Sequence, residues 1–226
     1  MNTIKNEFDE KYAHINLYFD MLDKLINKAA KLQDNTGDIH EVNHDLIKVL
    51  KANVFLLLYN LLESTVRKST EHIHISLSTD TLQYKDFQKE VQKIWIEFKY
   101  NNLKDQGSSQ ILDVFENIST DLINVGYDDY INKRKANDMS GNVDAKSVRE
   151  LSTKYGFSNN SRVKGGSLVI IKNRRNNLAH GNITFAECGK DYTYSELIKF
   201  KKEVYLFLKE FLNNVEKFTS IKSYKK

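Results

Sequence analysis

The chain has 226 residues, with nine glycines, no proline and one cysteine. This length suits one domain, or one domain with an insertion, around a sizeable core, and the absence of proline leaves long helices uninterrupted. A formal net charge of +4 permits binding to phosphate without requiring it. The single Cys188 excludes an intrachain disulfide framework and fits a reducing compartment, with a small packed side chain as its expected role. The N-terminus lacks an apolar signal segment, and no later apolar run approaches about 18 residues, so we expect a soluble cytoplasmic protein without a membrane span.

Two helices are expected in the first third of the chain. Residues 3 to about 32 carry apolar side chains on one side and charges on the other, which predicts an amphipathic helix. The cluster at residues 34–38 predicts a turn, and a second helix follows from about 40 to 75. Between residues 54 and 62 this second helix is apolar nearly all round, so we expect it to be the central, most buried element.

The start of the second helix contains a literal H-E-x-x-H, from His40 to His44, and Glu63 follows at a spacing that resembles a third zinc ligand. Residues 45–62 form one continuous helical pattern, which would place Glu63 about 28 Å from His44. Ligands of one zinc ion lie about 2 Å from the metal, so Glu63 and His44 cannot bind the same ion on a continuous helix. Asp38 can cap this helix and Glu41 suits its first turn, so we interpret the motif as a solvated helix start and expect no metal.

The middle of the chain predicts two further helices, over residues 87–98 and 111–122, separated by a loop at 105–109. From about 124 to 166 the composition shifts toward Gly, Asn, Asp and Lys, which predicts an insertion with one short helix, from about Ala145 to Lys154, capped by Asp144. The insertion contains five basic residues that could contact phosphate: Lys133, Arg134, Lys135, Arg162 and Lys164. The alternative, which is the more common case, is that they lie in a solvated loop.

The residues best suited to catalysis or binding lie close together in a predicted helix that begins at residues 165–167 and ends at His180. Its apolar stripe consists of Leu168, Ile171, Leu178 and Ala179. Gly181 follows where a left-handed residue commonly ends a helix. His180 therefore lies at the helix C-terminus, where the macrodipole favours a protonated imidazole. The glycines at 165 and 166 do not match the phosphate-binding loop pattern. They also lie about 20 Å from His180 along the helix, so they cannot bind the same phosphate as His180.

Arg175 projects near the centre of this apolar stripe, so it must be paired or must face a cleft. Asn173, Asn176 and His180 fall together on a second face of the same helix. Taken alone, this spacing is equally compatible with a paired core arginine and a polar helix cap. After the motif helix, residues 193–196 form a capping box that opens a long amphipathic helix through about residue 215, and a basic tail occupies residues 222–226.

Residues 175–180, Arg-Asn-Asn-Leu-Ala-His, resemble the R-N-x-x-x-H signature of the HEPN superfamily (higher eukaryotes and prokaryotes nucleotide-binding), especially its stand-alone prokaryotic members. The following residues 181–185, the last helix and residues 56–67 resemble the same family, whereas residues 80–160 show no match residue by residue. Together with the helical periodicity, the resemblance predicts an all-α, antiparallel helical bundle with an insertion before the motif helix.

The resemblance implies a metal-independent endoribonuclease without a cofactor. In such an enzyme Arg175 would bind the phosphate, because its planar guanidinium gives two charge-assisted hydrogen bonds. His180 would move protons at the 2′-hydroxyl and at the leaving oxygen. The supporting residues would be Asn176, Asn173, Tyr59 and Glu63, and the RNA contacts would be Lys172, Arg174, Arg162 and Lys164. The competing interpretation of Glu63 is a surface ion pair with Arg67, one turn along its helix.

One histidine must serve as both acid and base unless the site is duplicated, and Arg175 and His180 project about 140° apart on one helix. A two-fold homodimer with a composite active site would supply two of each residue. By analogy with the family, the protein would be a toxin or phage-defence effector, with an antitoxin or regulatory protein as its partner. The alternative is a non-catalytic module of the same fold that binds RNA, a nucleotide or a protein partner.

Overall fold

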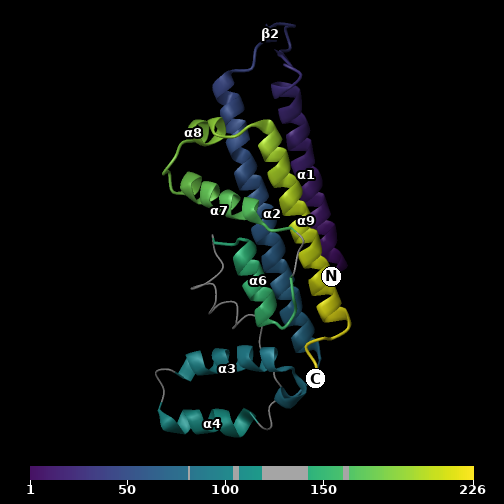
Figure 1. The fold of residues 1–226 in the computed structure, drawn as a ribbon, viewed down its shortest axis with the longest axis vertical. Coiled ribbons are helices and arrows are strands. Elements are labelled where there is room, and N and C mark those ends of the chain that lie inside the picture. Colours follow the sequence, from purple (N-terminus) through teal and green to yellow (C-terminus); the bar gives the residue numbers. More distant parts are fainter. Residues whose placement is uncertain (81, 104–106, 119–141, 160–162) are drawn as a thin grey trace.

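The computed structural model describes the chain except for residues 81, 104–106, 119–141 and 160–162 (Figure 1). The described part is all-α apart from one two-stranded hairpin, as predicted. The elements in chain order are α1 (Asn2–Ile26), β1 (Leu32–Gln33), β2 (Ile39–His40), α2 (His44–Thr79), the 3-10 helix η1 (Tyr84–Asp86), α3 (Lys89–Leu103), α4 (Ser108–Ile118), α6 (Ala145–Lys154), α7 (Gly166–Ala179), α8 (Phe185–Lys190) and α9 (Tyr194–Ser220).

Three long helices, α1, α2 and α9, lie side by side and form the body of the bundle (Figure 1). The helix α1 runs opposite to α2 and α9, which run in the same direction because α7 and α8 bring the chain back beside the first part of α2 (Figure 1). The helix α2 packs against α1, α7, α8 and α9. Its buried side chains include Phe55, Leu58, Tyr59 and Leu62, which confirms it as the central element.

The predicted boundary between the first two helices was wrong. The helix α1 ends at Ile26, and the chain then forms the β1–β2 hairpin. Its turn is held by the Asp34 carboxylate, which accepts hydrogen bonds from the backbone N–H groups of Thr36 at 2.9 Å and Asp38 at 3.0 Å. The helix α2 begins only at His44, because Asn43 acts as its N-cap and accepts a 2.7 Å hydrogen bond from the Asp45 backbone.

The H-E-x-x-H motif is therefore split between two elements. His40 lies in β2, where its Nε2 atom is 3.0 Å from the Asp34 carboxylate, while His44 is the first residue of α2. The two imidazoles do not share a helix face, so the spacing that makes this motif a zinc site is lost. In the part of the chain that the structure describes, no group of three His, Cys, Asp or Glu side chains is placed to hold a metal ion.

The predicted short helix is confirmed as α6, with Asp144 as its N-cap. Val143, Val148, Leu151 and Tyr155 are buried, so this part of the predicted insertion belongs to the hydrophobic core. The remainder, residues 124–141, lies outside the described residues, as do Lys133, Arg134, Lys135 and Arg162.

The C-terminal part folds back onto the bundle. The helix α9 begins with the predicted capping box between Thr193 and Glu196. The predicted basic tail is not free, because Lys222 and Lys225 pair with Asp80 at 2.5 and 3.2 Å and the buried Tyr224 donates a 2.7 Å hydrogen bond to the same carboxylate. These groups lower the pKa of Asp80 to about 2, with Lys222 making the largest contribution. No described helix is long and apolar enough to cross a membrane.

Candidate active site

The motif helix α7 ends as the sequence predicts. Gly181 has a φ of +70°, and two backbone hydrogen bonds close the helix end, from Gly181 N–H to the Leu178 oxygen at 3.3 Å and from Asn182 N–H to the Asn177 oxygen at 2.9 Å. This pair of bonds is the Schellman arrangement, which requires a left-handed residue after the C-cap. His180 is that C-cap and is exposed to solvent.

Arg175 is held on three sides. Its guanidinium carbon lies 4.1 Å from the centre of the Tyr59 ring, its Nη2 atom lies 3.5 Å from the Glu63 carboxylate, and Nη1 donates a 2.9 Å hydrogen bond to the Asn176 side-chain oxygen. Only 22% of the side chain is exposed. The sequence predicts that an arginine on the apolar stripe is paired or faces a cleft, and the structure shows that Arg175 is paired. The ring, carboxylate and amide together fix the plane of the guanidinium.

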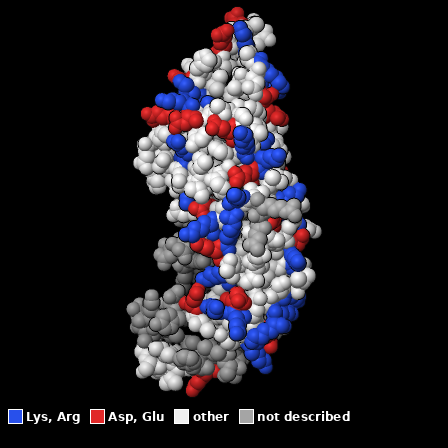
Figure 2. Space-filling model, in the orientation of Figure 1, with Lys and Arg blue, Asp and Glu red and all other residues white. Residues whose placement is uncertain are grey.

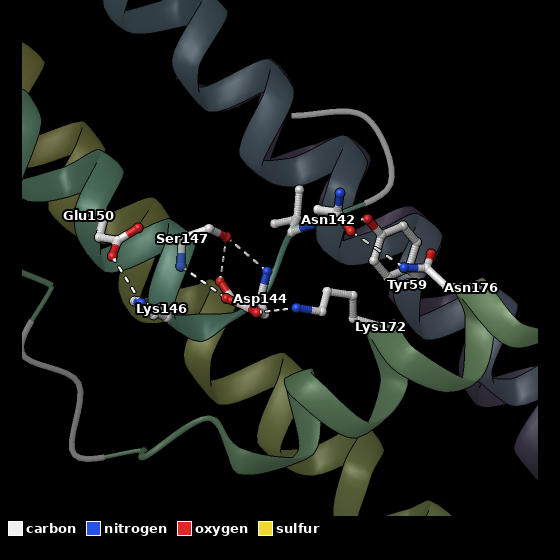
Figure 3. Close-up of polar contacts among 9 residues, drawn as sticks. Tyr59, Asn142, Asp144, Lys146, Ser147, Glu150, Lys172 and Asn176 are labelled. Atoms are coloured by element: carbon white, nitrogen blue, oxygen red, sulfur yellow. Dashed lines mark hydrogen bonds and ion pairs between the residues drawn. The ribbon is translucent and has the colours of Figure 1, made fainter. Parts of the chain in front are cut away.

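The supports of Arg175 are themselves held by the segment that precedes α6 (Figure 3). The Asn176 amide nitrogen lies 3.5 Å from the Asn142 side-chain oxygen. The Val143 N–H donates a 3.1 Å hydrogen bond to the Tyr59 hydroxyl oxygen. Burial raises the pKa of Tyr59, and the Val143 hydrogen bond opposes this effect, so the phenol stays protonated at neutral pH.

Two predicted RNA contacts, Lys172 and Arg174, are engaged within the protein. Lys172 forms a 2.5 Å ion pair with Asp144. Arg174 lies over the Tyr192 ring, donates a 2.8 Å hydrogen bond from Nε to its hydroxyl, and pairs with Asp191 at 3.2 Å. Both cations therefore have carboxylate partners within the protein, and their contact with RNA stays a prediction.

The remaining predicted residues lie at the surface or outside the described chain. Asn173 and Lys164 are exposed, and the Lys164 carbonyl accepts a 2.9 Å hydrogen bond from Arg149. Ala179, predicted on the buried stripe, is exposed because the last turn of α7 projects away from α2 at the side of the bundle (Figure 1).

Sequence reasoning missed several parts of this site. The contact of Asn142 has no signal in the sequence. The ion pair between Asp144 and Lys172 has none either, because these two residues are 28 positions apart. The helix α8 was also missed, although Thr184 and Glu187 form a capping box that could have identified it. The residues that follow α8, Asp191 and Tyr192, hold Arg174.

An all-α bundle whose central helix supports the arginine of an R-N-x-x-x-H motif defines a HEPN-type domain. The chain belongs to the MAE_28990-like HEPN family, whose model matches residues 1–224. This match also spans residues 80–160, where the motif comparison found no correspondence. Searches of curated proteins and of solved structures each found no match. Membership of this family points to a ribonuclease-like or nucleotide-binding module.

Proposed function

We propose that the protein is an endoribonuclease that cleaves RNA without a metal ion and acts in the cytoplasm as a toxin or phage-defence effector. The observation that carries the proposal is the fixed guanidinium of Arg175, held by Tyr59, Glu63 and Asn176, on the helix that ends at the exposed His180. Support for the biological role comes from the resemblance to the family alone.

The chemistry needs few groups because RNA supplies its own nucleophile. The 2′-oxygen attacks the adjacent phosphorus and loses its proton, the bond to the 5′-oxygen breaks, and that oxygen gains a proton. Arg175 would bind the nonbridging phosphate oxygens and offset the charge that accumulates on them. His180 would transfer the protons, since the unperturbed pKa of an imidazole lies near neutral pH. The products are a 2′,3′-cyclic phosphate and a 5′-hydroxyl.

A second copy of the chain would complete the site. Arg175 lies against α2, whereas His180 is exposed beyond the last turn of α7, so the two side chains of one protomer leave the helix in different directions. Two-fold pairing would bring a second histidine to the site, and one imidazole could then act as base while the other acts as acid.

The outer face of α7 suits such pairing. Val169 and Ile170 are 40% and 38% exposed and fall on the side of α7 that also carries Asn173 and His180. In Figure 2 the surface over α7 is mostly uncharged, with charged side chains around it. We propose that two α7 helices meet through this face, because burying these apolar side chains favours association and the composite site requires a second histidine.

The test is to incubate the purified protein with RNA in EDTA and to analyse the ends of the products. We expect products with cyclic phosphate ends, and their loss in His180→Ala and Arg175→Ala. His14→Ala is the control, because His14 is an exposed histidine on α1, and it should cleave like the wild type. Unchanged cleavage by His180→Ala would refute the site. RNA binding without products would favour the alternative, a non-catalytic binding module.

A further inference from the structure

Three consecutive residues before α6 reach the motif helix or its support. Asn142 contacts Asn176 on α7, the Val143 backbone donates to Tyr59 on α2, and Asp144 binds Lys172 on α7 (Figure 3). The Val143 side chain is also buried in the core. The segment therefore ties α6, α2 and α7 together beside Arg175.

Asp144 uses its two carboxylate oxygens for different purposes. Oδ1 accepts a 3.0 Å hydrogen bond from the Ser147 backbone and caps α6, whereas Oδ2 binds Lys172 at 2.5 Å. The Asp144 and Lys172 side chains are only 13% and 19% exposed. Because water screens such a pair weakly, loss of one partner leaves a poorly solvated charge and favours displacement of the segment.

Two of the three groups that hold Arg175 depend on this segment. The Tyr59 ring stacks on the guanidinium and its hydroxyl is fixed by the Val143 N–H. Asn176 accepts a hydrogen bond from Arg175 and approaches Asn142 with its amide nitrogen. Movement of residues 142–144 would therefore free the Tyr59 hydroxyl and the Asn176 side chain together.

We infer that residues 142–144 are a positioning clamp for Arg175, and that Lys172 serves the reaction by holding this clamp through Asp144 instead of by contacting RNA. This inference rests on the proposed ribonuclease function. Lys172, Asp144 and Asn142 are positioning residues, because they act on the phosphate only through Arg175 and its supports.

The test is the Asp144→Asn variant, because asparagine caps helices as well as aspartate does but cannot form the ion pair. We expect kcat for RNA cleavage to fall at least about tenfold while KM stays within about twofold of wild type. Lys172→Met should show the same pattern, and the double variant should lose no more than either single variant. The salt dependence of RNA binding should not change, because no phosphate contact is removed.

A direct RNA contact by Lys172 predicts a different pattern. Lys172→Met would then raise KM and reduce the salt dependence of binding, while Asp144→Asn, which leaves the lysine charged and unpaired, would cleave as fast as wild type. That pattern would overturn the inference. Glu150→Gln is the matched control, because Glu150 pairs with Lys146 on the exposed side of the same helix at 3.7 Å, with 65% and 82% of these side chains exposed. It should leave kcat unchanged.

Hydrogen exchange at the Val143 amide separates failure of the clamp from failure of the ribonuclease proposal. We expect this amide to exchange faster in Asp144→Asn and in Tyr59→Phe, which removes its acceptor, than in wild type or Glu150→Gln. If wild type does not cleave RNA, the proposed function fails, and unchanged exchange in Asp144→Asn would independently refute the clamp.

Discussion

Replacing Gly189 by alanine tests the close packing of α8 on α2, which places the end of the loop that follows His180. A Cβ atom at Gly189 would lie 1.8 Å from the Lys48 carbonyl oxygen and 2.6 Å from its carbonyl carbon. Ordinary contact begins at 3.4 Å, so α8 would have to move away from α2 by about 1.6 Å. The obstacle is helix backbone, which cannot rotate aside as a flexible side chain can.

Two effects of this substitution have opposite signs. Helix propensity favours alanine over glycine by about 1 kcal/mol, whereas overpacking against a rigid neighbour costs about 3 kcal/mol or more. We therefore expect the free energy of unfolding of Gly189→Ala to fall by about 2 kcal/mol, and Tm by about 4 to 8 °C. Urea and thermal unfolding followed by circular dichroism would measure both quantities.

Gly166→Ala is the matched control, because Gly166 is the first residue of α7 and no atom lies within 4 Å of its added Cβ. We expect its stability to stay equal to that of the wild type or to rise by up to about 1 kcal/mol. Gly189→Ala with a Tm equal to or above that of the wild type would refute the close approach of α8 to α2.

Three further predictions concern the proposed active site, the C-terminal contacts and the proposed dimer. Arg175→Lys keeps the charge but loses the planar group that stacks on Tyr59, so single-turnover cleavage should fall about 100-fold; a rate within about threefold of wild type would contradict the role of Arg175. The folded pKa of Asp80, about 2, lies below its unfolded value of about 3.9, so its stabilising effect is present above about pH 4 and is lost as the pH falls toward about 2. Urea unfolding should show wild type about 1 to 2 kcal/mol more stable than Asp80→Asn at neutral pH, with the difference disappearing in that acid range; a difference independent of pH would rule out this linkage. Ile170→Glu should sediment as a monomer while Ile75→Glu, an exposed position on α2, stays dimeric; a dimeric Ile170→Glu protein would exclude pairing through α7.

The sequence by itself determined the features that depend on neighbouring residues. The helical periodicity placed Arg175 toward the core, and Gly181 marked the helix end that makes His180 a C-cap. The capping box at Thr193 and Glu196 located the start of α9. Each of these features rests on backbone geometry or on hydrogen bonds that span a few positions, so the local pattern is sufficient to predict it. The start of α2 shows the limit of this reasoning, because Asp38 and Asn43 could both cap a helix and only Asn43 does so.

Only the tertiary structure decided what surrounds these residues. The Glu63 carboxylate meets Arg175 from 112 positions away, Tyr59 receives a hydrogen bond from the Val143 backbone, and Asp144 turns its second oxygen to Lys172. The expected basic tail instead packs on Asp80. Such contacts depend on how helices pack against one another, and packing is set by the fit of whole surfaces that no local pattern records.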